Sequence, residues 1–326
     1  MDEPTQSHNP HDHLARKVFG RREEAAGFFQ AYLPENLGKR IKAESLHREP
    51  VTFIDESLEG SVADLLYRLE DGDGELYLYC LFEHQSQPDK WMPFRLLQYM
   101  LRIWSDFRDK HPGKPSLPPI LPAVLHQGKQ GWTAARSFRE LVAIPADMRS
   151  DFQPFIPDFS FTLVDLAKIP FDQVKGTLLG KLAMMAQKAT SEDRVEEFWD
   201  TAGDFIKELA KAKTTTGLLQ IVIRYLCFTK TSFDKKAMLD KVKKIGSSKL
   251  EEYVMTIAQE CIEQGLEQGL EQGLEQGIEQ GREKGRDEKE REIVLRMNAS
   301  GMEVEGIVDL TGIAKPDVLR HLAAES

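Results

Sequence analysis

Three polar residues in the first hundred have the types and spacing of a divalent-metal site. Glu83 and Gln85 are two residues apart in a segment rich in aromatic and aliphatic residues, so both point to the same face of the strand that this segment predicts. Asp64 lies in a second strand-like segment, before the turn sequence Asp71-Gly-Asp-Gly74. Oxygen ligands favour magnesium or manganese over zinc. These residues therefore predict a site for Mg²⁺, with Mn²⁺ as a possible substitute.

The turn between the two segments decides whether the carboxylates can meet. A two-residue or a four-residue loop within 71–74 places Asp64 opposite Leu81 and diagonal to Glu83. Diagonal cross-strand neighbours lie about 7–8 Å apart, a distance that a cation can bridge through side chains. Two carboxylates there repel each other unless a cation or a proton lies between them. An odd loop length would break this register, and the alternative interpretation is that these residues cap strand ends in solvent.

Helices and further strands must position this hairpin. Apolar spacing predicts one helix over 11–33, weakened at Gly20 and ended by Pro34, and another over 92–111. Asp12 heads the first helix, where a carboxylate is a good N-cap. A proline-rich loop is expected over 112–122. Strands are predicted over 51–58, 62–70, 75–82, 123–126 and 159–166.

The C-terminal half divides into three parts: a helical region over 176–262, a four-residue repeat over 263–291 and a short helical tail over 292–326. The repeat reads Glu-Gln-Gly-Leu, and its leucines advance by about 40° per unit around a helix, so they form no straight seam. Each glycine costs a helix about 1 kcal/mol relative to alanine. The repeat is therefore either a flexible tether or a helix on which partner helices pack closely. The tail is compatible with a helix-turn-helix or with a self-association cap.

Composition narrows the class of protein. The chain has 326 residues, 41% of them hydrophobic, which excludes wholesale disorder. No run of about 18 apolar residues occurs and the start is polar, so we expect no membrane span, no secretory signal and a cytoplasmic location. Three cysteines are too few and too scattered for a disulfide framework or a zinc site.

The net charge of −10 is unevenly distributed. Residues 260–291 hold ten acidic and five basic residues, whereas residues 16–48 hold eight basic and four acidic ones. Binding to nucleic acid depends on the charge that faces the phosphates and not on the overall charge. The acidic total is therefore compatible with DNA as a partner.

Several motifs resemble one known family. They are His11-Asp-His-Leu-Ala-Arg-Lys-Val-Phe19, Phe28-Phe-Gln-Ala-Tyr-Leu-Pro34, Ser61-Val-Ala-Asp-Leu-Leu-Tyr67, Leu81-Phe-Glu-His-Gln-Ser86 and Arg95-Leu-Leu-Gln-Tyr-Met100, followed by Pro119-Ile-Leu-Pro122 and Trp132-Thr133. Over about residues 10–240 the chain resembles the Rpn family of recombination-promoting nucleases, also called YhgA-like transposases. The Glu-His-Gln-Ser run with the upstream Ser-x-x-Asp-Leu-Leu-Tyr is the most specific part of the likeness.

The resemblance implies a fold and an activity. Members are assigned to the PD-(D/E)XK nuclease superfamily, an α/β (α+β) fold with a mixed sheet flanked by helices, here expected over 1–175. The resemblance implies that the protein is a magnesium-dependent endonuclease. Its substrate would be DNA, in a role linked to recombination, mobile elements or phage defence. Asp64 would be the motif aspartate and Glu83 the second acid, while Gln85 stands where the superfamily usually has lysine. Neutral glutamine can orient a water but cannot stabilise developing negative charge as lysine does.

Other residues are secondary candidates. Arg95, Tyr99 and Arg102 follow the motif strand on a predicted helix and could contact phosphate, although packing with snorkelling arginines explains them equally well. In related nucleases the first helix can supply an extra acid, which here would be Asp12 or Glu24. The alternative function is a weak or inactive DNA-binding accessory protein. In either case the repeat and tail are candidates for self-association.

Overall fold

The computed structural model describes residues 10–50, 63–71, 74–83, 87–211, 216–229, 235–246 and 248–323. The chain divides into two compact units, residues 1–258 and 259–326, and each is described by itself. Within the described residues, no helix combines the length and apolar character that crossing a bilayer requires.

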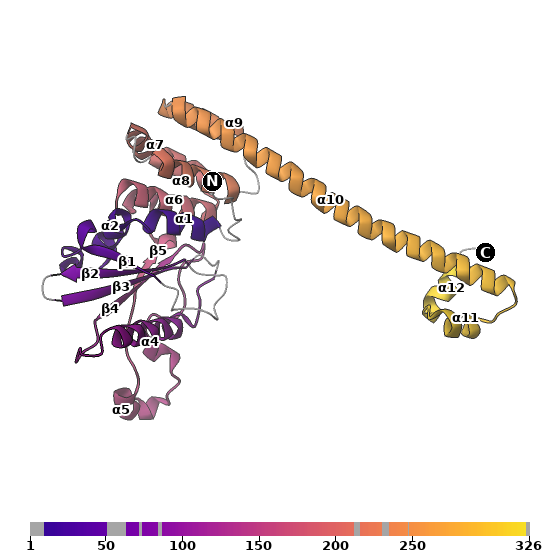
Figure 1. The fold of residues 1–326 in the computed structure, drawn as a ribbon, viewed down its shortest axis with the longest axis horizontal. Coiled ribbons are helices and arrows are strands. Elements are labelled where there is room, and N and C mark those ends of the chain that lie inside the picture. The colour runs from indigo at the N-terminus through magenta and orange to yellow at the C-terminus, as the bar shows by residue number, and fades with distance from the viewer. Residues whose placement is uncertain are drawn as a thin grey trace. The chain divides into compact units, whose positions relative to one another are not determined.

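The first unit is built on one five-stranded mixed sheet (Figure 1). In spatial order the strands are β1 (Leu46–Glu49), β2 (Ala63–Asp71), β3 (Gly74–Glu83), β4 (Ile120–His126) and β5 (Thr162–Asp165). Neighbours are antiparallel from β1 to β3 and parallel from β3 to β5. The predicted α/β class and the last four predicted strands are confirmed, whereas the strand expected over 51–58 lies outside the described residues.

Strand β1 was not predicted, because its four residues show no apolar alternation. Its Leu46 is buried, while Glu49 accepts a hydrogen bond from Arg68 of β2 at 2.8 Å. A cross-strand ion pair of this kind holds a short, charged edge strand against its neighbour.

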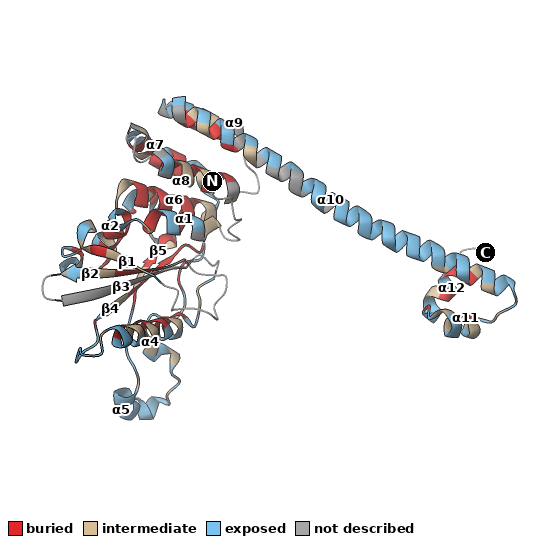
Figure 2. Ribbon diagram, in the orientation of Figure 1, coloured by how far each residue is buried: buried red, intermediate tan, exposed pale blue. Residues whose placement is uncertain are grey.

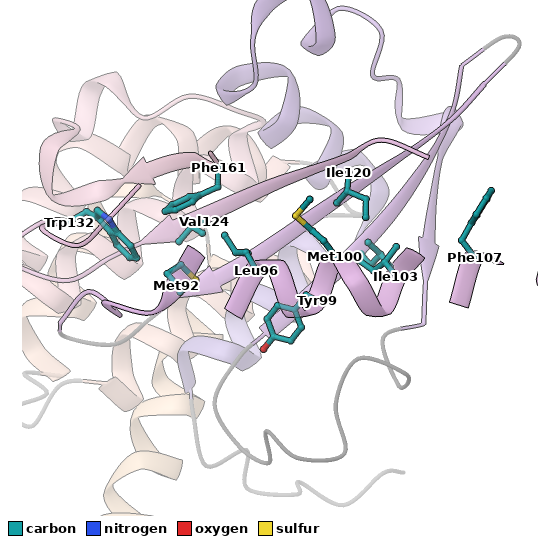
Figure 3. Close-up of a cluster of buried hydrophobic side chains, with 11 residues drawn as sticks. Met92, Leu96, Tyr99, Met100, Ile103, Phe107, Ile120, Val124, Trp132 and Phe161 are labelled. Atoms are coloured by element: carbon teal, nitrogen blue, oxygen red, sulfur yellow. The ribbon is translucent and has the colours of Figure 1, made fainter. Parts of the chain in front are cut away.

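Helix α4 (Met92–Lys110) covers one face of the sheet, as Figure 1 shows. Its Leu96, Met100 and Ile103 pack in one buried cluster with Leu66 of β2 and Val124 of β4 (Figure 3). The helical spacing predicted over 92–111 is therefore confirmed, and its apolar stripe is the surface that binds the sheet.

The opposite face is covered by α1 (Pro10–Phe19), α2 (Arg22–Tyr32) and α6 (Leu178–Glu192) (Figure 1). Tyr67 of β2 donates a hydrogen bond to the carbonyl oxygen of Phe19, which ties α1 to the sheet. The single helix predicted over 11–33 is wrong. The chain breaks at Gly20 and Arg21, and Arg21 is extended at φ −89° and ψ 132°.

The first unit contains further α-helices. Most of them lie in the helical region predicted over 176–262. They are α3 (Glu35–Gly38), α5 (Arg149–Phe152), α7 (Val195–Lys211), α8 (Thr216–Thr229) and α9 (Lys235–Ile245). Glu24 of α2 accepts hydrogen bonds from the Thr177 hydroxyl and from the Gly180 N–H, the latter at 3.1 Å. Both groups belong to the start of α6, so this buried carboxylate caps that helix.

The repeat is helical. Helix α10 (Ser248–Ala299) contains all of it in 52 residues, and Figure 2 shows that the middle of this helix is exposed where it is described. Leu266, Leu270 and Leu274 are each about two-thirds exposed, at 66%, 68% and 65%.

The tail forms α11 (Val304–Thr311) and α12 (Lys315–Ala323), which confirms the two turns predicted around Gly301 and Gly312. Both glycines have positive φ, +86° and +72°, a conformation that glycine adopts without steric cost. Val294 of α10 packs with Ile307 of α11 and with Val318 of α12 in a small buried core. The second unit thus has a core of its own.

Candidate functional site at the sheet edge

Polar residues from four strands lie together at one end of those strands, which we call the sheet edge. Strand β2 begins at this edge and β3, β4 and β5 end at it, because β2 runs antiparallel to the others. Asp64 pairs with Leu81, which confirms the register predicted from the turn. Glu83 pairs with His126 of β4, and His126 pairs with Asp165 of β5.

These positions share a face of the sheet. Register partners project to the same side, and residues two apart on one strand do so as well. Asp64 therefore shares a face with Glu83, His126 and Asp165, which is also the face covered by α4. For Asp64 and Glu83 the structure describes the backbone, whereas Gln85 lies outside the described residues.

His126 and Asp165 form a buried pair at this edge. The imidazole Nδ1 lies 3.2 Å from Asp165 Oδ1, and His126 has no exposed surface. The second carboxylate oxygen accepts a hydrogen bond from the Trp132 backbone N–H at 2.8 Å and lies 3.3 Å from Lys168 Nζ. The Trp132 ring stands edge-on to the imidazole, with centroids 5.3 Å apart. The ring of His126 is thus held on two sides.

A sharp turn after β4 makes this arrangement possible. Gly131 has a φ of +73°, and a Cβ there would lie 3.2 Å from the Asp165 carboxylate. The turn therefore brings the Trp132 N–H directly onto the carboxylate. Burial alone would raise the pKa of Asp165, but hydrogen bonds from His126, Trp132 and Lys168, with the electrostatic attraction of His126, hold that pKa below its ordinary value. Asp165 is accordingly ionised at neutral pH.

The other imidazole nitrogen is different. His126 Nε2 is fully buried and has no hydrogen-bond partner among the residues that the structure describes. Since an ionised carboxylate can only accept, Nδ1 donates to Asp165, and in a singly protonated ring Nε2 then presents a lone pair. A buried acceptor without a partner is rare in folded proteins.

Sequence reasoning missed His126 and Asp165. Each ends a short apolar strand, after Ala123-Val-Leu125 and after Thr162-Leu-Val164. A polar residue that ends an apolar strand was the signal for Glu83, and the same signal was present in both places. What the sequence lacked was the order of the strands, which alone shows that the three ends are neighbours.

The three residues of α4 that are predicted to contact phosphate lie in different environments. Arg95 forms an ion pair with Asp89 at 3.0 Å, and both side chains are largely buried. Tyr99 of α4 is buried and belongs to the same hydrophobic cluster as Leu96 and Met100 (Figure 3). Arg102 is partly exposed. Asp12 lies inside the first turn of α1, which begins at Pro10, so the expected N-cap position is wrong.

Among the side chains that the structure describes, no three or more His, Cys, Asp or Glu residues gather closely enough to hold a metal ion. The side chains of Asp64 and Glu83 are not among those described. The paired carboxylate positions and the partnerless Nε2 of His126 are the donors that fit such an ion.

The comparison with known families agrees with this part of the fold. Residues 9–216, more than half of the chain, match the family described as "Putative transposase, YhgA-like". The chain belongs to this family. The match spans the whole sheet and helices α1 to α7. All residues discussed at the sheet edge therefore lie inside the matched region.

Curated YhgA-like relatives from Escherichia coli K-12 carry the Rpn name, which confirms the resemblance read from the motifs. The chain is 26% identical over 321 residues to the inactive recombination-promoting nuclease-like protein RpnE, covering 98% of this chain and 99% of that protein. It is 24% identical to the recombination-promoting nuclease RpnA, over 80% of this chain and 86% of the relative. To the nuclease RpnC it is 34% identical, over 40% and 42%. No solved structure matches the chain.

Proposed function

We propose that this protein is a metal-dependent DNA endonuclease of the PD-(D/E)XK type, with Asp64, Glu83 and Gln85 at its centre. The observation that carries the proposal is the strand register, which brings the Asp64 and Glu83 positions to one edge and one face of the sheet. The names of RpnA and RpnC, as recombination-promoting nucleases, support it. The substrate follows from the family: DNA in recombination, at mobile elements or in phage defence, and hence in the cytoplasm.

The residues at the edge have separable roles. Asp64 and Glu83 hold Mg²⁺, or Mn²⁺ in its place, and Asp12 is a candidate for an additional acid. When bound, such an ion lowers the pKa of a water and stabilises charge on the phosphate. Gln85 orients the attacking water through hydrogen bonds. Because Gln85 is neutral, it adds no positive charge, and a slow enzyme is the expected result.

We expect phosphate contacts from α4 and from residues 16–48, which we call the basic segment. Arg102 is partly exposed and can reach a phosphate from where it stands. Arg95 first has to release Asp89, and Tyr99 first has to leave its buried position. In the basic segment, Lys17 and Arg16 are exposed on α1. Contacts to phosphate from these residues supply affinity without sequence preference.

The test is nicking of a supercoiled plasmid by the full-length protein, with and without Mg²⁺ or Mn²⁺. Asp64→Asn and Glu83→Gln preserve side-chain size and remove the charge that holds the cation. Both variants should lose metal-dependent nicking, whereas the matched surface control Asp158→Asn should keep it. Equal residual nicking in all four proteins would show contaminating nuclease and refute the proposal.

A specific observation favours a second candidate function. RpnE, which aligns over nearly the whole chain, is named as inactive. Together with the neutral Gln85, this supports a DNA-binding accessory protein with a vestigial nuclease core. Stoichiometric DNA binding without cleavage in Mg²⁺, Mn²⁺ or Co²⁺ would establish this alternative.

The exposed leucines of α10 support self-association as part of either function. Leu266, Leu270 and Leu274 leave a large apolar surface in solvent, which a second copy of the chain can bury. Sedimentation of the full chain, compared with a variant in which all three are glutamine, tests this. A monomeric wild type would refute it.

A further inference from the structure

The imidazole of His126 occupies an unusual place in the fold. It is completely buried at the end of β4. One nitrogen is held by Asp165, and the other has no hydrogen-bond partner in the described part of the chain. The Trp132 ring, packed edge-on, and the backbone hydrogen bond from Trp132 to Asp165 fix the ring further. Such support orients a nitrogen lone pair that nothing in the described structure uses.

His126 lies beside the proposed catalytic carboxylate position on the neighbouring strand. Glu83 is the register partner of His126 on the adjacent parallel strand, where backbones run about 4.8 Å apart. The two residues share a face of the sheet. A carboxylate cannot satisfy a lone pair, because both groups are acceptors. A cation can satisfy both at once.

We propose that His126 Nε2 is a ligand of the divalent cation that Asp64 and Glu83 hold, with Asp165 as the residue that positions the ring. This inference rests on the proposed metal site and adds a ligand to it. A carboxylate hydrogen-bonded to the far nitrogen is the usual support of a metal-binding histidine, since it fixes the tautomer and increases ligand basicity. The turn that brings Trp132 onto Asp165 is closed by a hydrogen bond from the Gly131 N–H to the Gly128 carbonyl.

The ligand changes which metal the site prefers. Carboxylate and water ligands suit magnesium and manganese, whereas imidazole suits later transition metals. A site with two carboxylates and one imidazole should bind Mn²⁺ and Co²⁺ more tightly than Mg²⁺. His126 should make this preference stronger than it would be in a site made of oxygen ligands alone.

Pulsed electron paramagnetic resonance on Mn²⁺ bound to the full-length protein tests the coordination directly. A nitrogen ligand gives a hyperfine coupling to the manganese, and that coupling changes when the protein is made with histidine labelled with the heavy nitrogen isotope. We expect this coupling in the wild type. The measurement requires no variant, so it stands even if a substitution at the buried His126 prevents folding.

Variants assign the coupling to one residue. His126→Asn should abolish it and weaken Mn²⁺ binding by at least about 10-fold, and Asp165→Asn should weaken binding about 10-fold through the loss of ring support. His111→Asn is the matched control, since His111 bonds to the Phe107 carbonyl within α4, and it should change neither quantity. Far-UV circular dichroism of each variant verifies the fold.

The results separate this inference from the proposed function. If Mn²⁺ binding depends on Asp64 and Glu83 but shows no nitrogen coupling, His126 is not a ligand and the proposed site stands without it. If Mn²⁺ binding is unaffected by Asp64→Asn and Glu83→Gln, both the inference and the proposed metal site are refuted. A coupling that persists in His126→Asn also overturns the inference.

Discussion

Replacing Asp165 by asparagine tests whether the edge of the sheet depends on a buried charge. The substitution keeps the size of the side chain and an oxygen that can accept from the Trp132 N–H, which now bonds at 2.8 Å. It removes the negative charge that faces His126 and Lys168. It also turns an NH2 group toward His126 Nδ1, so the hydrogen bond to the imidazole is lost together with the charge.

The magnitude follows from the number and kind of these interactions. A hydrogen bond to a charged group contributes about 1.5–3 kcal/mol. Lys168 is largely exposed, so its ion pair adds little to this. We expect the free energy of unfolding to fall by about 2 kcal/mol at neutral pH.

The loss should depend on pH in a defined direction. The folded-state pKa of Asp165 lies below the ordinary value of 3.8. Its ionised form therefore stabilises the fold fully at pH values above 3.8, and this contribution is lost as the pH falls from there through the folded pKa. The difference between wild type and Asp165→Asn should be constant near neutrality and shrink in acid.

Urea unfolding followed by tryptophan fluorescence measures this, since Trp132 touches the pair. The matched control is Asp158→Asn, because Asp158 forms an exposed ion pair with Arg139 at 2.7 Å. Exposed pairs contribute about 0–1 kcal/mol, so the control should be close to wild type. Equal unfolding midpoints for wild type and Asp165→Asn at neutral pH would refute the reasoning, as would a difference that grows in acid.

Three further predictions concern packing. Ile307→Ala should lower the free energy of unfolding of the second unit by about 2–4 kcal/mol, because Ile307 is buried. Leu310→Ala, on the exposed side of α11, should change it little. Thermal melts followed by circular dichroism measure both. Gly273→Ala and Gly277→Ala should each stabilise α10 by about 1 kcal/mol, since an added Cβ meets no atom within 4 Å, and a lower melting temperature would instead reveal a closely packed partner helix. Tyr67→Phe should cost about 1–3 kcal/mol in urea unfolding, because the buried Phe19 carbonyl loses its donor, and an unchanged midpoint would contradict this.

The hairpin register was predictable because it depends only on local rules. Alternation of side chains and an even loop length were enough to place Asp64 opposite Leu81. Helix α4 was predictable for a similar reason, since its apolar stripe repeats over 19 residues. Both features are encoded within short stretches of the chain.

Features that depend on distant residues were not predictable. The break at Gly20 is an example: a Cβ there would lie 2.2 Å from the Arg16 carbonyl and 2.9 Å from a nitrogen of Arg48, which is far away in sequence. The His126–Asp165 pair joins residues 39 apart in sequence. Strand order decides such contacts, and no periodicity reveals it.

In the proposed metal site, the balance of charges favours a histidine ligand over a third carboxylate. Lys168 compensates Asp165, and a divalent cation brings as many positive charges as Asp64 and Glu83 bring negative ones. A third anionic ligand would leave the edge with a net negative charge, which repels the DNA backbone. A neutral imidazole completes the coordination without that cost, and neutral Gln85 preserves the same balance. The substitution His126→Asp, which restores an all-oxygen site, should therefore move the metal preference toward Mg²⁺ and at the same time weaken DNA binding.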